Sequence, residues 1–261
     1  MKPNSFDGPL IRGIAMAYAG LGPRPRGVPS GLGHFHCPRW RNAATSPVWP
    51  LTKTVTRRQL DGLERYFVRR PKRHPFDDAG RCYLSVLQGR GGHDVRSIGR
   101  VARAAGWKRR ERTLTLDVWL RPLALDPPSG YSVRFARLRR SAIHSDFMAL
   151  TRANFRSSAR FLRELEAMFK GIESNTFEVV FYSKGGKPAA AGLVTTGGSG
   201  GYFFCGSVAP HHRGRGLWRA LVAARQWLSK ADGARYWAAS TKNPRIAGKC
   251  DRAFGIVTFW K

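Results

Sequence analysis

The stretch from residue 201 to residue 228 limits the possible folds of this chain more than any other. An apolar run that ends at Pro210 predicts a strand, and a loop with glycines at 214 and 216 leads from it into a helix. The helix is predicted by apolar residues that recur on one face: Leu217, Leu221, Ala224 and Leu228. The first turn of a helix has unpartnered N–H groups and partial positive charge, and glycines let an anion approach them closely. The segment therefore predicts a phosphate-binding loop in an α/β fold.

The spacing of this loop separates it from two common nucleotide-binding loops. A Walker loop needs Gly-x-x-x-x-Gly-Lys-Ser/Thr and a dinucleotide loop needs Gly-x-Gly-x-x-Gly, and this loop fits neither pattern. Its own pattern, formed by Val208, Pro210, Arg213 and Gly216, resembles the signature of the GNAT superfamily of acyl-CoA N-acyltransferases. Trp218 departs from that signature, because it stands where the family has a small residue. The loop or the helix start must therefore make room for an indole.

The GNAT resemblance covers residues 131–261 and implies direct attack of a substrate amine on the thioester of a bound acyl-CoA, with acetyl-CoA as the default donor. It implies that a backbone N–H near Val208 contacts the thioester oxygen and that the loop holds the diphosphate. The residues that the resemblance assigns to acyl-CoA binding are Val208, Arg213, Gly214, Arg215, Gly216, Leu217 and Asn243. His211 and His212 face the loop, and we expect them to bind CoA and not to transfer protons.

The strand before the loop carries Phe203 and Cys205, where many family members place a glutamate. In the last predicted helix, Asp251 stands in the register at which many members have a tyrosine. The candidates for catalytic proton transfer are therefore Asp251, Ser207 and Glu178. For Asp251 the alternative is a surface ion pair with its basic neighbours. An acceptor amine that is already neutral would need only a chain of water molecules.

Proline- and glycine-rich breaks divide the chain into parts. The predicted division is a loosely ordered basic arm over residues 1–54, a small α/β domain over 55–125 and a GNAT acyltransferase domain over 131–261. The predicted fold class is α/β with a mixed sheet, in which a GNAT-type fold follows a smaller α/β domain. The order helix, Gly-aromatic, strand makes the smaller domain resemble a degenerate, cofactor-free GNAT half, and an unrelated α/β domain is the alternative.

The C-terminal end lacks one strand of a complete GNAT domain. The pairing of Asn243 with Pro244 predicts the start of a last helix that reaches about Ala253, and a final strand begins at Gly255. The chain ends before a further strand can form. Either the N-terminal half supplies it, with the strand predicted over residues 113–120 as the candidate, or the sheet ends open.

The charge of the chain suggests the chemistry of a partner. Lys and Arg number 46 against 16 acidic residues, a net charge of +30 that the two halves share equally. A polyanion would offset the resulting self-repulsion, whereas non-specific stickiness is the alternative. We therefore expect the acceptor amine to lie on a nucleic acid, with DNA favoured. The expected nucleic-acid contacts are Arg57, Arg58, Arg69, Arg70, Lys72 and Arg73. The alternatives are a small-molecule or protein amine, or a non-catalytic nucleic-acid-binding protein on a GNAT fold.

Cysteine usage and hydropathy exclude several other classes. The four cysteines form no CxxC pair, which predicts reduced thiols and a cytoplasmic protein. Cys205 and Cys250 are expected to be small buried apolar residues. No apolar run is long enough to span a membrane. His34, His36 and Cys37 cluster without a second ligand pair, so no metal site is predicted.

Overall fold

The computed structural model describes residues 7–19, 28–34, 48–68, 82–138, 142–155, 162–163, 165–166, 169, 175–241 and 249–261. Its helices are α1 (Gly8–Ala19), α2 (Arg57–Val68), α3 (Val95–Ala104), α4 (Ile143–Phe155) and α6 (Leu217–Ala231), with a 3-10 turn over Pro210–His212. Its strands are β1 (Leu32–His34), β2 (Val48–Pro50), β3 (Tyr83–Gln88), β4 (Lys108–Trp119), β5 (Tyr131–Arg137), β6 (Thr176–Ser183), β7 (Pro188–Gly197), β8 (Gly200–Val208), β9 (Tyr236–Thr241) and β10 (Arg252–Trp260). No helix in these ranges combines the length and the apolar character that a membrane span requires.

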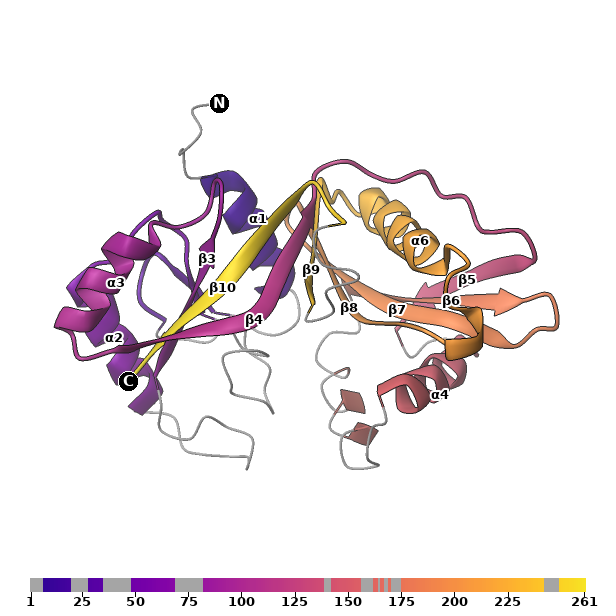
Figure 1. Cartoon of the computed structure of the whole chain (residues 1–261), viewed down its shortest axis with the longest axis horizontal. Coiled ribbons are helices and arrows are strands. Elements are labelled where there is room, and N and C mark those ends of the chain that lie inside the picture. The colour runs from indigo at the N-terminus through magenta and orange to yellow at the C-terminus, as the bar shows by residue number, and fades with distance from the viewer. Residues whose placement is uncertain are drawn as a thin grey trace.

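One mixed sheet of eight strands runs through the whole molecule in the order β3-β10-β4-β9-β8-β7-β6-β5 (Figure 1). Only the β8–β9 pair is parallel, and the other pairs of this sheet are antiparallel. Strands β1 and β2 form a separate small sheet. The mixed α/β fold class predicted from the sequence is confirmed.

The two halves of the chain exchange strands within this sheet. Strand β4, from the N-terminal half, lies between β9 and β10 and pairs Thr115 with Thr241. Strand β10, from the end of the chain, lies between β3 and β4 and pairs Trp260 with Tyr83. The missing strand is thus supplied by β4, as the sequence suggested. The exchange matters because β9 would otherwise present unpaired N–H and C=O groups along this side.

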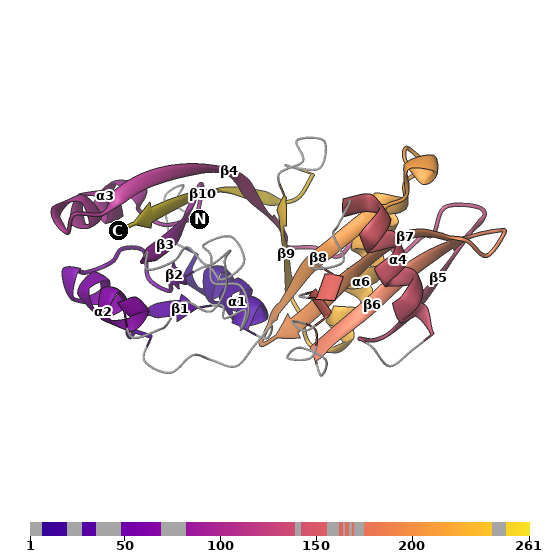
Figure 2. The same ribbon diagram turned by 90° about the horizontal axis from the view of Figure 1, so that it is seen from below.

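The N-terminal segment differs from the loosely ordered arm predicted for residues 1–54. Residues 8–19 form α1, and the side chains of Leu10, Ile11 and Ile14 are buried. Figure 2 shows α1 beside β8, at the joint between the two halves. Asp7 fixes the helix start, since its carboxylate accepts from the Leu10 N–H and lies 2.7 Å from the Arg252 guanidinium. Burial against the shared sheet stabilises a helix that is too short to be stable alone.

The helices of the C-terminal half lie on opposite faces of the sheet. Helix α6 packs on one face against β6 and β7, and α4 packs on the other (Figure 1). The central core, on the α4 side, joins side chains from α1 and α4 to side chains from β3, β4, β6, β7 and β10. Because this core takes residues from both halves, we expect them to fold as one unit.

The predicted last helix does not reach Ala253. Residues 249–251 form a loop, and β10 begins at Arg252, where the ladder to Val118 starts. Ala253 pairs with Asp117 in that ladder. Two strand neighbours, β3 and β4, supply more backbone hydrogen bonds than a last helical turn could keep. The predicted helix start at Asn243 lies outside the described residues.

Candidate functional site

Strands β8 and β9 separate halfway along their length. Their parallel pairing covers Gly200 to Phe203 on β8 and stops where Phe203 faces Ala239. Beyond that point β9 pairs only with β4 on its other side, up to Thr241. A gap therefore opens between the two strands, with its apex at Phe203 and its wide end at the loop after Val208.

A bulge in β8 lies beside this gap. Phe204 pairs with Leu193 and Ser207 pairs with Ala191, so two residues of β8, Cys205 and Gly206, lie opposite Gly192 alone. Among the described residues, Cys205 is the one non-glycine residue with a positive φ, at 50°. Such a conformation costs of order 1 kcal/mol and is typical of functional sites.

The backbone N–H of Val208 points into the gap. The N–H of Ala209 donates to the carbonyl of Ala189, which makes that pair a hydrogen-bonded one. Hydrogen-bonded and non-hydrogen-bonded pairs alternate along an antiparallel ladder. Val208 and Ala190 therefore form a non-hydrogen-bonded pair. The Val208 N–H faces away from β7, toward the place that β9 has left.

The loop between β8 and α6 presents backbone donors. Gly214 and Gly216 have φ values of 77° and 79°, and no side chain caps the start of α6. Within the described part of the chain, no carbonyl accepts a hydrogen bond from the N–H of Gly214, Arg215 or Gly216. The side chains of Arg213 and Arg215 are exposed beside them. Open amides, a helix start and two cations together could hold a phosphate or diphosphate.

Two contacts hold the loop in place. The Tyr131 hydroxyl lies 3.0 Å from His212 Nδ1, and Arg213 Nε donates to the Val208 carbonyl at 3.2 Å. The linker from β4 to β5 passes over α6, as Figure 1 shows. There the Leu123 N–H donates to the side chain of Gln226 at 2.7 Å. The donors of the loop are thus fixed before any ligand arrives.

Solved structures with the same arrangement of elements identify the fold. A GCN5-related N-acetyltransferase from Kribbella flavida superposes with a TM-score of 0.60 at 12% identity, over 98% of this chain and 96% of its own. A conserved protein of unknown function from Staphylococcus epidermidis gives 0.55 at 12% identity, over 92% and 94%. A tandem GNAT protein from the clavulanic acid biosynthesis pathway gives 0.52 at 17% identity, over 68% of this chain and 63% of its own. The chain has the GNAT fold. No protein-family model matches the sequence, and no curated protein matches it.

Trp218 fits into this GNAT fold because Gly206 has no side chain. A Cβ atom built on Gly206 would lie 3.0 Å from the Trp218 ring. The indole thus occupies the space above the bulge, on the α6 side of β8. The departure that the sequence showed at position 218 is accommodated by Gly206, which is distant from Trp218 in the sequence but adjacent to it in space.

Arg225 lies below Trp218 on the same helix and is 1% exposed. Its Nε donates to the Leu221 carbonyl at 3.0 Å, and its Nη1 donates to the Leu193 carbonyl at 3.4 Å. The guanidinium carbon lies 4.4 Å from the Phe203 ring centroid and 5.6 Å from that of Trp218. Burial lowers the pKa of Arg225 to about 9, so the group is still a cation at pH 7. Sequence analysis missed this residue, because a single arginine on a helix gives no sign of burial.

Ser207 lies on the opposite face of β8, toward α4. Its hydroxyl accepts a 3.4 Å hydrogen bond from Asn154 Nδ2 and is almost buried. Asn154 Oδ1 and Thr151 Oγ1, both on α4, are buried without a partner among the described residues. Both oxygens belong to α4, which packs on the same side of the sheet as Ser207. Ser207 is the one predicted proton-transfer candidate that the structure places beside the gap.

Glu178 lies elsewhere on that face. Glu178 is fully buried on β6 and contacts His144, which lies at the start of α4. Asn154 lies at the end of the same helix. Ten residues of helix separate His144 from Asn154, a rise of about 15 Å. Glu178 and Ser207, both named as candidates, are therefore held at opposite ends of α4. His144 was not predicted, because the contact joins an isolated histidine to a strand 34 residues away.

Asp251 lies in the loop before β10 and binds the start of the linker. Its carboxylate accepts from the backbone N–H groups of Leu120 and Arg121, at 2.8 and 3.3 Å, and from the Arg121 guanidinium at 3.1 Å. Burial acts to raise the pKa of Asp251, but these hydrogen bonds outweigh it, and the pKa lies below its usual range. A carboxylate so engaged is a weak base, and its contacts are those of a structural clamp.

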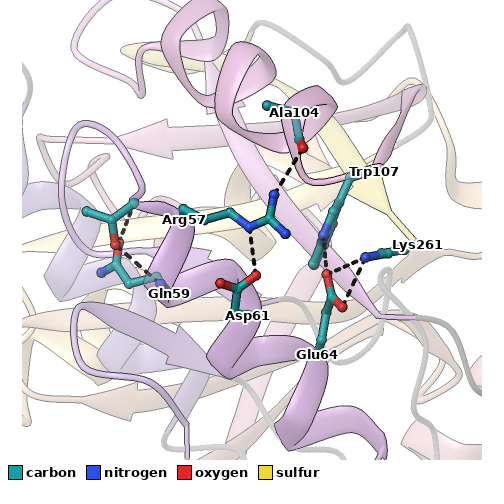
Figure 3. Close-up of polar contacts among 8 residues, drawn as sticks. Arg57, Gln59, Asp61, Glu64, Ala104, Trp107 and Lys261 are labelled. Atoms are coloured by element: carbon teal, nitrogen blue, oxygen red, sulfur yellow. Dashed lines mark hydrogen bonds and ion pairs between the residues drawn. The ribbon is translucent and has the colours of Figure 1, made fainter.

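The residues predicted to bind nucleic acid are mostly outside the described ranges. This is true of Arg69, Arg70, Lys72 and Arg73, and of the CoA-binding candidate Asn243. Arg57 lies 2.8 Å from Asp61 and donates to the Ala104 carbonyl at 3.0 Å (Figure 3), while Arg58 is exposed. Figure 1 shows that α2, which carries both, lies at the opposite end of the molecule from α6.

The remaining candidates are the histidines and cysteines, of which the structure describes only some. No group of three potential metal ligands occurs among the described residues, and His36 and Cys37 lie outside them. Cys205 and Cys250 are free and half-buried. Burial raises the pKa of Cys205 to about 12 and that of Cys250 to about 11, so both are protonated thiols at neutral pH.

Proposed function

We propose that this protein is an acyl-CoA-dependent N-acyltransferase. The observation that carries the proposal is the loop before α6, where the amides of Gly214, Arg215 and Gly216 are open and the Val208 N–H faces the gap. The loop would bind the diphosphate. The pantetheine arm would lie in the gap, beside the part of β8 that has no pairing with β9. The fold is compatible with this activity, which GNAT structures are named for.

In the proposed reaction the acceptor amine attacks the thioester carbonyl. The C–N bond forms, the C–S bond breaks, the amine loses a proton and the CoA thiolate gains one. The Val208 N–H would donate to the carbonyl oxygen as negative charge develops on it. Asn154 and Ser207 would orient the amine through hydrogen bonds. No described carboxylate lies in the gap, so the acceptor we propose is an amine that is neutral at pH 7 and passes its proton to water.

A small-molecule amine fits the acceptor side of the gap better than a macromolecule. Helix α1 packs on β7, β8 and β9, and α4 packs on β6, β7 and β8. The two helices together cover this face of the sheet. Ser207 is 7% exposed, so little of it can be reached from the surface by a large group such as a base. The tandem GNAT structure from the clavulanic acid pathway has a small-molecule context that agrees with this. A net charge of +30 further favours a neutral or acidic small amine over a polyamine.

The net charge supports a second candidate, an amine on a nucleic acid. A protein with 46 basic and 16 acidic residues attracts phosphates over long distances. The apparent affinity for DNA or RNA would then fall steeply with salt, by about five log units per decade if six phosphates are contacted. Transfer of label from acetyl-CoA to nucleic acid, in preference to a panel of small amines, would make this the leading acceptor.

A matched pair of variants tests the CoA site without knowledge of the acceptor. Gly214 has a positive φ that Asn and Asp both tolerate, and no atom lies within 4 Å of a Cβ built there. Gly214→Asn and Gly214→Asp therefore differ chiefly in one negative charge. We expect calorimetric Kd values for CoA to rise about 100-fold in Gly214→Asp and only about threefold in Gly214→Asn. Equal affinities in the two variants, or no CoA binding by the wild type, would remove the basis of the proposal.

A further inference from the structure

Arg225 is a buried cation without an anion. Its Nη2 atom is buried and has no hydrogen-bond partner among the described residues, and no described carboxylate forms an ion pair with the side chain. Transfer of a charge into a protein interior costs several kcal/mol unless a partner offsets it. Only a part of this cost is offset here, by the rings of Phe203 and Trp218 and by the carbonyls of Leu193 and Leu221. The arrangement lacks the carboxylate that normally accompanies such an arginine.

The guanidinium contacts β8 at the apex of the gap, from the α6 face of the sheet. It stacks on Phe203, the last residue of β8 that pairs with β9. Cβ atoms built on Gly192 and Gly206 would lie 3.2 and 3.3 Å from Nη1, so both glycines leave space for it at the bulge. The phosphate loop is at the opposite, wide end of the gap. The pantetheine arm of an acyl-CoA bound at that loop would run back along β8 past Val208. Its acyl group would then lie nearest to the bulge and Arg225.

We propose that the acyl group carried to this site ends in a carboxylate, and that Arg225 is the residue that binds it. This inference rests on the proposed function and narrows it, because it replaces the acetyl default by the monothioester of a dicarboxylic acid, such as malonyl- or succinyl-CoA. The thioester would lie near Val208, and the acyl chain would extend toward the apex, where Nη2 offers its two unused N–H groups. The negative charge would thus complete the pair that the protein lacks.

The transfer step leaves that carboxylate unchanged. The amine nitrogen forms the bond to the thioester carbon, the C–S bond breaks, and the product is an amide with a free terminal carboxylate. One proton leaves the amine and one reaches the CoA sulfur. Arg225 takes no part in proton transfer, and its role is to select and orient the acyl chain.

The first test is a series of acyl-CoA ligands with the wild-type protein. Calorimetry gives Kd values for CoA, acetyl-CoA, butyryl-CoA, malonyl-CoA, succinyl-CoA and glutaryl-CoA. Butyryl-CoA is the control for succinyl-CoA, since the two have four-carbon chains and differ in the carboxylate. We expect at least one dicarboxylic thioester to bind 10- to 100-fold more tightly than butyryl-CoA. If all of them bind no more tightly than butyryl-CoA while CoA itself binds, the inference is wrong and the proposed function stands. If CoA does not bind, the proposed function fails.

The second test removes the cation. In Arg225→Met the preference for the dicarboxylic thioester over butyryl-CoA should disappear, while the Kd for CoA changes less than threefold. Lys230→Met is the matched control, because it removes an exposed cation from the same helix and should keep the preference. A preference retained in Arg225→Met would overturn the assignment. Should that variant fail to fold in a thermal melt, the wild-type series decides by itself.

Discussion

The helices α2 and α6 begin in opposite ways, although each follows a strand that leads into a loop. At the start of α2 the Thr56 N–H donates to Gln59 Oε1 at 2.8 Å, and the Gln59 N–H donates to Thr56 Oγ1 at 3.2 Å. This reciprocal pair satisfies the donors of the helix start internally. At the start of α6, Gly216 offers no side chain and the loop amides stay open. The helix start is therefore closed by a side chain at α2 and left open at α6.

The surroundings of α2 extend the contrast. Its Glu64 carboxylate accepts from the Trp107 indole N–H at 2.9 Å and from the Lys261 ammonium at 3.0 Å, as Figure 3 shows. The last residue of the chain is thus tied to a helix of the N-terminal half. The polar groups of α2 serve internal contacts, and those around the start of α6 point outward. The N-terminal half completes the sheet through β4, and the start of its helix α2 is closed by a side chain.

The largest expected effect tests whether the two halves are one folding unit. Phe259, on the exchanged strand β10, is 2% exposed and packs in the core of the N-terminal half. Phe259→Ala should lower the free energy of unfolding by about 3–5 kcal/mol. Because β10, from the C-terminal half, pairs with β3 and β4 of the N-terminal half, urea unfolding followed by tryptophan fluorescence and by circular dichroism should stay a single transition. The control is Trp227→Ala, an exposed aromatic on α6, with an expected change below about 1 kcal/mol. Two separate transitions would contradict the shared unit.

The next effect concerns the open helix start directly. Gly216→Asp places a carboxylate, in a strained conformation, where the diphosphate would bind. We expect the Kd for CoA to rise about 100-fold, equivalent to ~2.8 kcal/mol. The same acid at the closed start, in Thr56→Asp, should leave the affinity unchanged, since Asp is a good N-cap residue. An affinity loss of similar size in both variants would show that charge acts at long range and that the two helix starts are not distinct.

A smaller effect is expected from opening the closed start. Thr56→Ala removes the hydroxyl that caps α2 and should lower the free energy of unfolding by about 1 kcal/mol in urea titrations. CoA affinity should not change, because α2 lies far from the loop. Thr54→Ala, at a neighbouring exposed position, is the control for general effects of a threonine loss. A change in CoA affinity in Thr56→Ala would mean that α2 takes part in binding.

The smallest effect should depend on pH. Asp251 has a pKa lowered from 3.8 in the folded protein, so its ionised form contributes stability that is fully present well above pH 4. This contribution is lost as the pH falls below 3.8 toward the lowered pKa. Asp251→Asn should therefore reduce the urea midpoint at pH 7, and its difference from the wild type should shrink near pH 3. Asp126→Asn, which removes an exposed carboxylate from the same linker, serves as the control. A constant difference at both pH values would argue against the clamp.

Local patterns predicted the strand, loop and helix over residues 201–228 well. The helix over Leu217–Ala231 and the glycines with positive φ at 214 and 216 follow from short-range rules of periodicity and turn geometry. Long-range contacts decided what those rules missed. Helix α1 is stable only because β7 and β8 bury its apolar residues, and Arg252 begins a strand because it pairs with Val118 of β4.

The sequence by itself determined the loop, its donors and the likeness to a GNAT fold, because each depends on residues adjacent in the chain. Only the tertiary structure decided which side chains surround the gap. It separated Glu178 from Ser207, gave Asp251 to the linker and placed Arg225 under the bulge of β8. The physical reason is that burial and the absence of a counter-charge arise from packing between strands and helices that are distant in sequence, and no local pattern records them.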